Sequence, residues 1–258
     1  MTAELLGLSA SILVVVGALI IGIALLLRSQ RLPDTWDLID VLLVLLVLVW
    51  MSTGSGLFTF KFATGAWVPT GDPPVVLMLI ATAIGTLSST AACFWRASGK
   101  ELGLVWASRR WMWVAVGLVV PFLVFSTGWV WLLEVLGYQV LEQDLLAQLR
   151  SGELGPAAVG FLLLYGVVVA PITEEVLFRG FLLPPLITQM GRWPAIFTGG
   201  LLFGLLHGSD APAIMPLAVL GVMLGWLRVA SRSLWPALTL HMVNNILAMG
   251  IVMLGFET

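Results

Sequence analysis

Long apolar segments, separated by short polar connections, occupy most of the 258-residue chain. An α-helix needs about 20 apolar residues to cross the hydrocarbon core of a bilayer, and most of the segments reach or approach that length. We therefore predict an all-α fold, a polytopic helical bundle with about eight transmembrane helices. The predicted segments are Leu5–Leu27, Leu38–Leu57, Pro74–Trp95, Trp111–Leu136, Pro156–Leu183, Trp193–His207, Ala211–Val229 and Leu234–Leu254.

Two parts of this pattern are less regular. The sixth and seventh segments are short and are joined by a tight connection, Gly208–Pro212, so they could be half-buried rather than full spans. The polar stretch from Tyr138 to Gly155 carries leucines at helical spacing. It is typical of an ordinary loop helix or of an amphipathic helix on the outer membrane surface.

The distribution of basic residues supports eight crossings. Nine Lys and Arg residues follow odd-numbered segments and two follow even-numbered ones, with Arg179 left out because it lies inside a segment. Because basic residues accumulate in cytoplasmic loops, this asymmetry predicts that both termini face outward. The nine are Arg28, Arg31, Arg96, Lys100, Arg109, Arg110, Arg192, Arg228 and Arg232, and the two are Lys61 and Arg150.

Composition narrows the class of protein. Hydrophobic residues make up 60% of the chain and charged residues 10%, and the net charge of -2 gives no reason to expect a nucleic-acid partner. We predict one integral, multi-pass membrane domain over residues 1–258. Residues 1–137 form N-terminal helices without catalytic motifs, and residues 156–255 form the helices that carry them. The compact loops and the lack of an apparent signal peptide favour a prokaryotic plasma membrane.

Two adjacent glutamates, Glu174 and Glu175, lie in the fifth segment. A carboxylate at membrane depth costs roughly 2.5 to 3.5 kcal/mol on insertion scales unless it is paired or lines a wet cavity. Arg179 lies one helical turn after Glu175 and can neutralise it, whereas Glu174 is rotated by about 100° and is free to face a cavity. Pro171 should kink or restart the helix beside them. A buried salt bridge alone would explain Glu175 and Arg179 but not Glu174.

The only two histidines of the chain lie on later segments. His207 ends the sixth segment, in which Gly200, Gly204 and Gly208 recur at the spacing that lets a neighbouring helix approach closely. His241 and Asn245 lie one turn apart in the eighth segment, with Asn244 beside them. Each motif alone is also typical of ordinary hydrogen bonding between membrane helices.

Together, the motifs Glu-Glu-x-x-x-Arg, Phe-x-x-x-His and His-x-x-x-Asn resemble those of the CPBP family of intramembrane proteases. This family, also called ABI or CAAX proteases, includes the type II CAAX prenyl endopeptidases. The resemblance covers about Pro171 to Asn245.

The resemblance implies an intramembrane endopeptidase that hydrolyses a peptide bond in a membrane-associated, and in some members prenylated, protein or peptide substrate within the lipid bilayer. It implies that Glu174 activates the attacking water, that His207 holds and polarises this water, and that His241 and Asn245 stabilise the oxyanion. Glu175 and Arg179 would shape the site.

The motifs are compatible with a mechanism that uses a metal ion and with one that does not. The soluble zinc-protease motif His-Glu-x-x-His is absent, but Glu174, His207 and His241 are candidate ligands for a divalent metal such as zinc. The enzyme is therefore expected to be metallo- or glutamate-dependent, with a preference for glutamate-activated water.

Two other functions use the same residues. A transporter or proton-relay protein could pass protons through the Glu/His cluster, although we see no inverted repeat of the kind that many transporters show. A catalytically idle membrane scaffold would tolerate the loss of Glu174.

Overall fold

The structure is a computed structural model, and it describes residues 40, 72–138, 154–207 and 211–254. Every regular element in these residues is helical, which confirms the predicted all-α class. The segment Leu5–Leu27, all of Leu38–Leu57 except Asp40, and the core of the polar stretch after Tyr138 lie outside the described residues.

Four helices of the described part are long and apolar enough to cross a membrane: Arg109–Val135, Pro156–Met190, Ile214–Ser231 and Trp235–Met253. They coincide with the fourth, fifth, seventh and eighth predicted segments. The sixth segment forms α12, Arg192–His207, whose 16 residues extend over about 24 Å at 1.5 Å per residue. It is therefore shorter than the hydrocarbon core of about 30 Å. The total of eight crossings stays a prediction.

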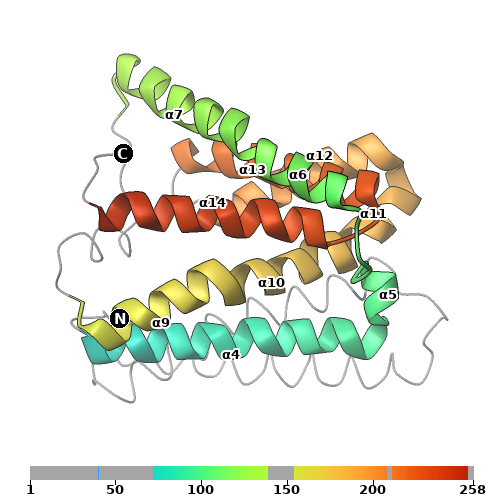
Figure 1. Cartoon of the computed structure of the whole chain (residues 1–258), viewed down its shortest axis with the longest axis horizontal. Helices are drawn as coiled ribbons and strands as arrows, with labels where there is room; N and C mark the ends of the chain where they lie inside the picture. Colours follow the sequence, from blue (N-terminus) through green and yellow to red (C-terminus); the bar gives the residue numbers. More distant parts are fainter. Residues whose placement is uncertain (1–39, 41–71, 139–153, 208–210, 255–258) are drawn as a thin grey trace, which may run out of the picture. The chain divides into compact units, whose positions relative to one another are not determined.

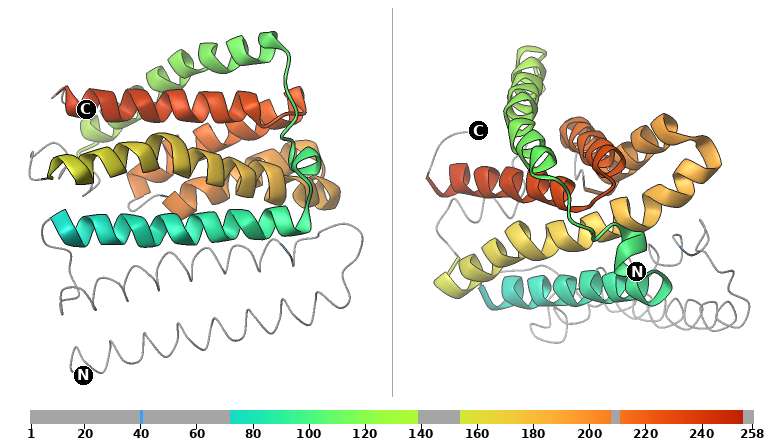
Figure 2. Two further views of the ribbon diagram at one scale, coloured as in Figure 1. Left: turned by 60° about the horizontal axis from the view of Figure 1, so that its bottom comes forward. Right: turned by 45° about the vertical axis from the view of Figure 1, so that its right-hand side comes forward.

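The chain divides into two compact units, and we describe each separately. The first unit holds α4, Asp72–Arg96, and α9, Pro156–Leu164, which lie side by side (Figure 2). At the end of α4, Arg96 forms an ion pair of 3.2 Å with the buried carboxylate of Asp40. The predicted single membrane domain is not tested by this division.

The second unit holds the helices that carry the three motifs. In it, α14 (Trp235–Met253) lies between α10 (Ala170–Glu174) on one side and α6 (Arg109–Gly117) with α13 (Ala211–Ser231) on the other (Figure 1). The helix α7, Val119–Val135, continues from α6. The core of this unit is apolar and comes from α6, α7, α13 and α14; its buried members are Ala115, Val119, Phe122, Leu220, Leu224, Leu227, Ala237 and Leu240.

Glycines bring α12 and α13 into backbone contact. A Cβ atom at Gly204 would lie 2.6 Å from the Ile214 carbonyl oxygen, and one at Gly200 would lie 2.7 Å from the Val222 nitrogen. Gly221 of α13 faces Gly200 in return. The close approach predicted from the glycine spacing is thus confirmed for Gly200 and Gly204, whereas Gly208 is outside the described residues.

The helix Pro156–Met190 is interrupted twice by π-helical turns, η2 (Tyr165–Val169) and η3 (Glu175–Leu182). Between them lies α10, and α11 (Leu183–Met190) completes the helix. In η3, the Leu183 N–H donates to the Phe178 carbonyl five residues earlier. The next bond of that kind would need an N–H on Pro184, which proline lacks.

The same reasoning applies to η2. The Gly166 carbonyl would need a donor at Pro171 in the π-helical register, so proline leaves this oxygen without a helical partner. The helix disturbance predicted at Pro171 therefore takes the form of a π turn that precedes it. The result is a continuous helix that changes register on both sides of Glu174.

Candidate active site

The glutamate pair lies at the junction of α10 and η3. Glu175 is buried, with 1% of its side chain exposed, and its Oε1 atom accepts a 3.0 Å hydrogen bond from Arg179 Nη1. The side chain of Glu174 is 19% exposed and turns away from this ion pair. The structure thus separates the two carboxylates as their positions on the helix predict.

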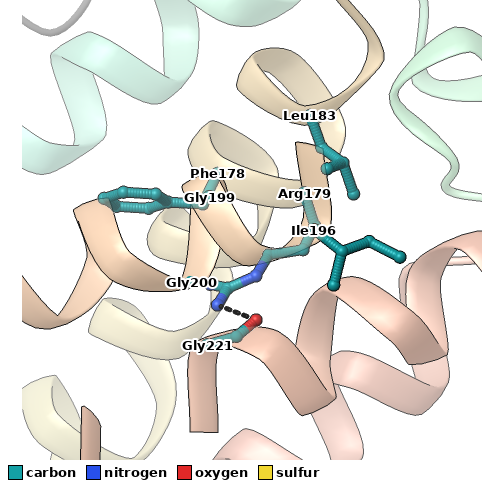
Figure 3. Close-up of a pocket in the computed structure, with 8 residues that line it drawn as sticks. Phe178, Arg179, Leu183, Ile196, Gly199, Gly200 and Gly221 are labelled. Atoms are coloured by element: carbon teal, nitrogen blue, oxygen red, sulfur yellow. Dashed lines mark hydrogen bonds between the residues drawn. The ribbon is translucent and has the colours of Figure 1, made fainter. Parts of the chain in front are cut away.

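Three groups from different parts of the chain hold the guanidinium of Arg179. Besides Glu175, it donates from Nη2 to the Gly221 carbonyl of α13 at 3.1 Å, as Figure 3 shows. Its central carbon lies 4.5 Å from the ring centroid of Phe203 on α12, in cation–π range. Arg179 therefore connects η3 to α12 and to α13.

One ring nitrogen of His207 faces the carboxylate of Glu174. Its Nδ1 atom lies 2.8 Å from the Phe203 carbonyl oxygen. Because a carbonyl oxygen only accepts hydrogen bonds, Nδ1 must carry the hydrogen. The opposite nitrogen, Nε2, lies 3.4 Å from Glu174 Oε1, and 31% of the histidine side chain is exposed. In the neutral ring, Nε2 is then a hydrogen-bond acceptor.

His241 repeats this arrangement from the other side. Its Nδ1 atom donates to Glu175 Oε1 at 2.9 Å, and its Nε2 atom lies 3.6 Å from Glu174 Oε2. In contrast to His207, the ring is buried. Glu175 therefore serves two partners through one oxygen: it neutralises Arg179 and it sets the tautomer of His241.

The two Nε2 atoms converge on the two oxygens of one carboxylate. With both rings neutral and Glu174 ionised, all of these atoms are hydrogen-bond acceptors. Such an arrangement needs a hydrogen between them, from a protonated member of the cluster or from a water molecule that donates to two of them. The separations of 3.4 and 3.6 Å exceed the 2.7 to 3.2 Å of a direct N–H···O bond. A water that bonds to both atoms of such a pair would lie to one side of it rather than between them.

Asn245 lies one turn beyond His241 but contacts a different group. Its Nδ2 atom donates to the Gly166 carbonyl at 2.8 Å, and its Oδ1 atom accepts from Asn244 at 3.3 Å. Gly166 is the residue whose carbonyl Pro171 leaves without a helical donor. Asn245 thus supplies the missing hydrogen bond and ties α14 to η2. An Asn amide has two N–H groups, and the second is not used by any bond to the described residues.

Several residues of the site carry no clear signal in the sequence. The ring of Phe203 is buried and contacts His207, His241 and Arg179, with centroid distances of 4.3 and 5.7 Å to the two histidine rings. The motif Phe-x-x-x-His includes Phe203, but nothing in that spacing indicates a ring shared by three functional side chains. Gly166 and Gly221 act through backbone carbonyls, for which side-chain identity gives no direct signal.

The described residues contain no group of three His, Cys, Asp or Glu side chains placed to hold one metal ion. Glu174, His207 and His241 meet pairwise around the Glu174 carboxylate. The divalent metal stays a prediction that chelation can test.

The comparisons with known proteins bear on this cluster. Residues 156–247 match the family described as type II CAAX prenyl endopeptidase Rce1-like. The resemblance predicted from the three motifs is thereby confirmed over this segment, which contains every candidate site residue. With its apolar helices, the chain is a multi-pass membrane protein.

A human protein, CAAX prenyl protease 2, is 52% identical to the chain over 40 residues. The match covers 16% of this chain and 12% of the human protein, so most of that relative has no counterpart in the alignment. No solved structure matches the chain.

Proposed function

We propose that the protein is an intramembrane endopeptidase that hydrolyses a peptide bond in a membrane-associated substrate by means of water activated at Glu174. One observation carries this proposal most directly. The Nε2 atoms of His207 and His241 face the two oxygens of Glu174, at the half-exposed edge of an otherwise buried cluster. Peptide hydrolysis needs a base and a positioned water at one point, and this arrangement offers a carboxylate as the base and two imidazole nitrogens that can hold a water beside it.

The chemical steps follow from the hydrogen-bonding capacity of these atoms. A water held between Glu174 and His207 gives a proton to the Glu174 carboxylate while its oxygen attacks the substrate carbonyl carbon. The carbonyl double bond opens to an oxyanion. When the C–N bond breaks, the proton passes from Glu174 to the leaving amine, and the carbonyl re-forms as a carboxylic acid. The carboxylate of Glu174 is restored.

The remaining residues position this chemistry. Glu175 accepts a hydrogen bond from the Nδ1–H of His241, and Arg179 donates a hydrogen bond to Glu175. Glu175 and Arg179 therefore act by positioning His241 and do not contact the substrate. The resemblance assigns the oxyanion to His241 and Asn245, and the second amide N–H of Asn245 is a suitable donor. In a soluble protease, the loss of one such donor costs about 2.7 to 4 kcal/mol of transition-state stabilisation.

The substrate class rests on the comparisons. The matched family is described as prenyl endopeptidases, and the matched human protein is named a CAAX prenyl protease. We extend this to a prenylated, or otherwise membrane-associated, protein or peptide substrate. A prokaryotic plasma membrane is the proposed location.

The direct test is cleavage of a fluorogenic prenylated CAAX-type peptide by the purified chain in nanodiscs, with products identified by mass spectrometry. We expect cleavage by the wild type and by Glu134→Gln, which makes the same chemical change on an exposed carboxylate of α7. His207→Ala should lose activity. Cleavage that survives His207→Ala would refute the mechanism, and Glu174-dependent proton uptake without cleavage of any peptide would favour the transporter.

A chelator arm tests the metal. Activity that persists after dialysis against a strong chelator supports glutamate-activated water alone. Activity that is lost and then restored by zinc would show that Glu174, His207 and His241 move into a metal-binding arrangement.

A further inference from the structure

A second polar feature of the same unit shares only Arg179 with the candidate active site. A cavity of about 280 Å³ lies between η3, α11 and α13, and its walls combine two arginines with apolar side chains. The residues that line it are Arg179, Leu183, Pro184, Ile187, Arg228 and Val229. Glu175 already neutralises Arg179, so Arg228 is the unpaired charge of a lining that contains no acidic residue, and such a cavity is suited to an anion.

No carboxylate among the described residues forms an ion pair with Arg228. Its Nε atom is buried and makes no hydrogen bond to the described residues. A buried, unsatisfied guanidinium N–H costs free energy, about 1 to 3 kcal/mol or more for a charged group. The Arg228 side chain as a whole is partly exposed and lines the cavity, so an anion bound in the cavity would lie close to its positive charge.

The backbone holds the guanidinium of Arg228 in place. A Cβ atom at Gly103 would lie 2.6 Å from three of its atoms, CZ, Nε and Nη2, so a side chain at this position would displace the guanidinium. Gly103 ends the short helix α5, Gly99–Leu102, with a φ of 92°, in the left-handed region that glycine favours. Its carbonyl accepts a bond from the Leu234 N–H. The arginine is packed against a fixed turn and is not a freely mobile surface side chain.

The cavity lies at the ends of two membrane helices. The candidate span Ile214–Ser231 ends three residues after Arg228, and Pro156–Met190 ends three residues after Ile187. Three residues of helix are about 4.5 Å long, which places both residues near the boundary between hydrocarbon and headgroups. Exposed Arg192 and Arg232 lie at the same ends of these helices, and such basic clusters attract anionic lipids.

We propose that this cavity, the Arg228 cavity, binds the phosphate group of an anionic phospholipid. The phosphate accepts hydrogen bonds from Arg228, and the glycerol and upper acyl chain lie against Leu183, Ile187 and Val229. The volume is close to the lower limit of pockets for small molecules, roughly 300 Å³, so the cavity suits a headgroup better than a peptide segment. This inference does not depend on the proposed peptidase activity.

The test uses the purified full-length chain in a neutral detergent. Short-chain phosphatidylglycerol, phosphatidylcholine of the same chain length and inorganic phosphate are titrated separately, and the thermal midpoint of unfolding is measured at each concentration. We expect phosphatidylglycerol to raise the midpoint, whereas phosphatidylcholine and inorganic phosphate have little effect. Equal stabilisation by the two lipids, or by phosphate alone, would overturn the proposal.

Variants localise the effect. Arg228→Gln should weaken the apparent affinity for phosphatidylglycerol by about tenfold or more, because it removes hydrogen bonds to a charged group. Val229→Trp, which fills the cavity and keeps the arginine, should weaken it too and provides a test if Arg228→Gln does not fold. Arg192→Gln, a matched loss of an exposed charge, removes only the general attraction of the surface and should weaken the affinity far less than Arg228→Gln. A loss in Arg192→Gln as large as in Arg228→Gln would show general surface attraction and contradict a built site.

Discussion

Glu175 holds two other residues of the cluster, Arg179 and His241, in position. Its Oε1 atom accepts hydrogen bonds from Arg179 and from His241, and the side chain is almost completely buried. A buried charge that loses its partner is far more costly than an exposed one, because neither water nor another group replaces the lost interaction. The effect of a substitution here should therefore appear in stability as well as in activity.

We expect Glu175→Gln to destabilise the protein by about 3 kcal/mol, because Arg179 stays buried without its counter-charge. Activity should fall as well, since the amide holds His241 less firmly. The measurement is the thermal midpoint in detergent alongside the cleavage rate. Glu134→Gln is the control, and a Glu175→Gln variant as stable as that control would show that the ion pair contributes little.

Several residue roles could be predicted from the sequence and several could not. The pairing of Glu175 with Arg179 follows from their separation of four residues, and the free carboxylate of Glu174 follows from its different face on the helix. The contact of both histidines with Glu174 depends on how three helices pack. The spacing of the motifs therefore predicts that these residues belong to one site, but not which atoms meet. The hydrogen bond from Asn245 to Gly166 has no sequence signal, because its acceptor is a backbone oxygen released by a change of helical register.

At the level of helices, the two π turns determine which way the candidate site residues of this helix face. Each π turn inserts about one extra residue into the helix, and one residue corresponds to a rotation of about 100° for everything that follows. Pro171 and Pro184 lie where each π-helical register ends. The sequence predicts that Pro171 disturbs the helix, because proline has no N–H to donate. It does not predict whether the helix kinks or forms a π turn, because both are compatible with the loss of that hydrogen bond.

Pro171→Ala tests this role of η2. Alanine supplies an N–H that donates to the Val167 carbonyl in an α-helical register, or competes with Asn245 for the Gly166 carbonyl in the π-helical register. We expect the protein to keep or gain thermal stability, whereas kcat/KM falls about a hundredfold, the loss that a displacement of 1 Å can cause. Pro236→Ala is the control, since a proline at the start of α14 has no N–H to lose from the helical ladder. Unchanged activity in Pro171→Ala would show that the register of η2 is not needed.

The contact between α12 and α13 allows a matched pair of glycine substitutions. Gly204→Ala places a Cβ atom within 3 Å of the α13 backbone, so we expect a loss of about 1 to 3 kcal/mol and a displaced His207. Gly128→Ala lies in the interior of α7 with nothing within 4 Å of its Cβ position, and it should stabilise by up to about 1 kcal/mol. Thermal midpoints of the two variants provide the comparison. Similar midpoints would contradict close packing at Gly204.

For the molecule as a whole, the pattern of apolar segments is a strong predictor of helices because lipid offers no hydrogen bonds. Every backbone N–H and C=O in the hydrocarbon core must find a partner within the protein, and a helix satisfies this condition locally. Long apolar segments therefore become helices with little influence from their neighbours, and the segments from Pro74 onward coincide with the observed helices. How those helices pack depends on long-range contacts, which the hydropathy pattern does not contain.

The orientation in the membrane is a prediction at this scale. The basic residues place the loop after α4 in the cytoplasm and the end of α7 outside. The chain's single cysteine, Cys93, is fully buried, so it should not react with a membrane-impermeant maleimide. In intact cells we expect Tyr138→Cys to be labelled and Ser108→Cys to be labelled only after permeabilisation. The reverse pattern would invert the topology and place the candidate active site toward the other side.

The proposal that Glu174 is the base that activates water is tested most directly by Glu174→Gln, for which cleavage and substrate binding are measured on the same nanodisc preparation. Gln keeps the size of the side chain but cannot accept the proton of the water. We predict that cleavage falls by about 10²- to 10⁴-fold, the usual contribution of a general base, and that the affinity for the prenylated peptide is unchanged. Cleavage by Glu174→Gln at the wild-type rate would contradict this mechanism.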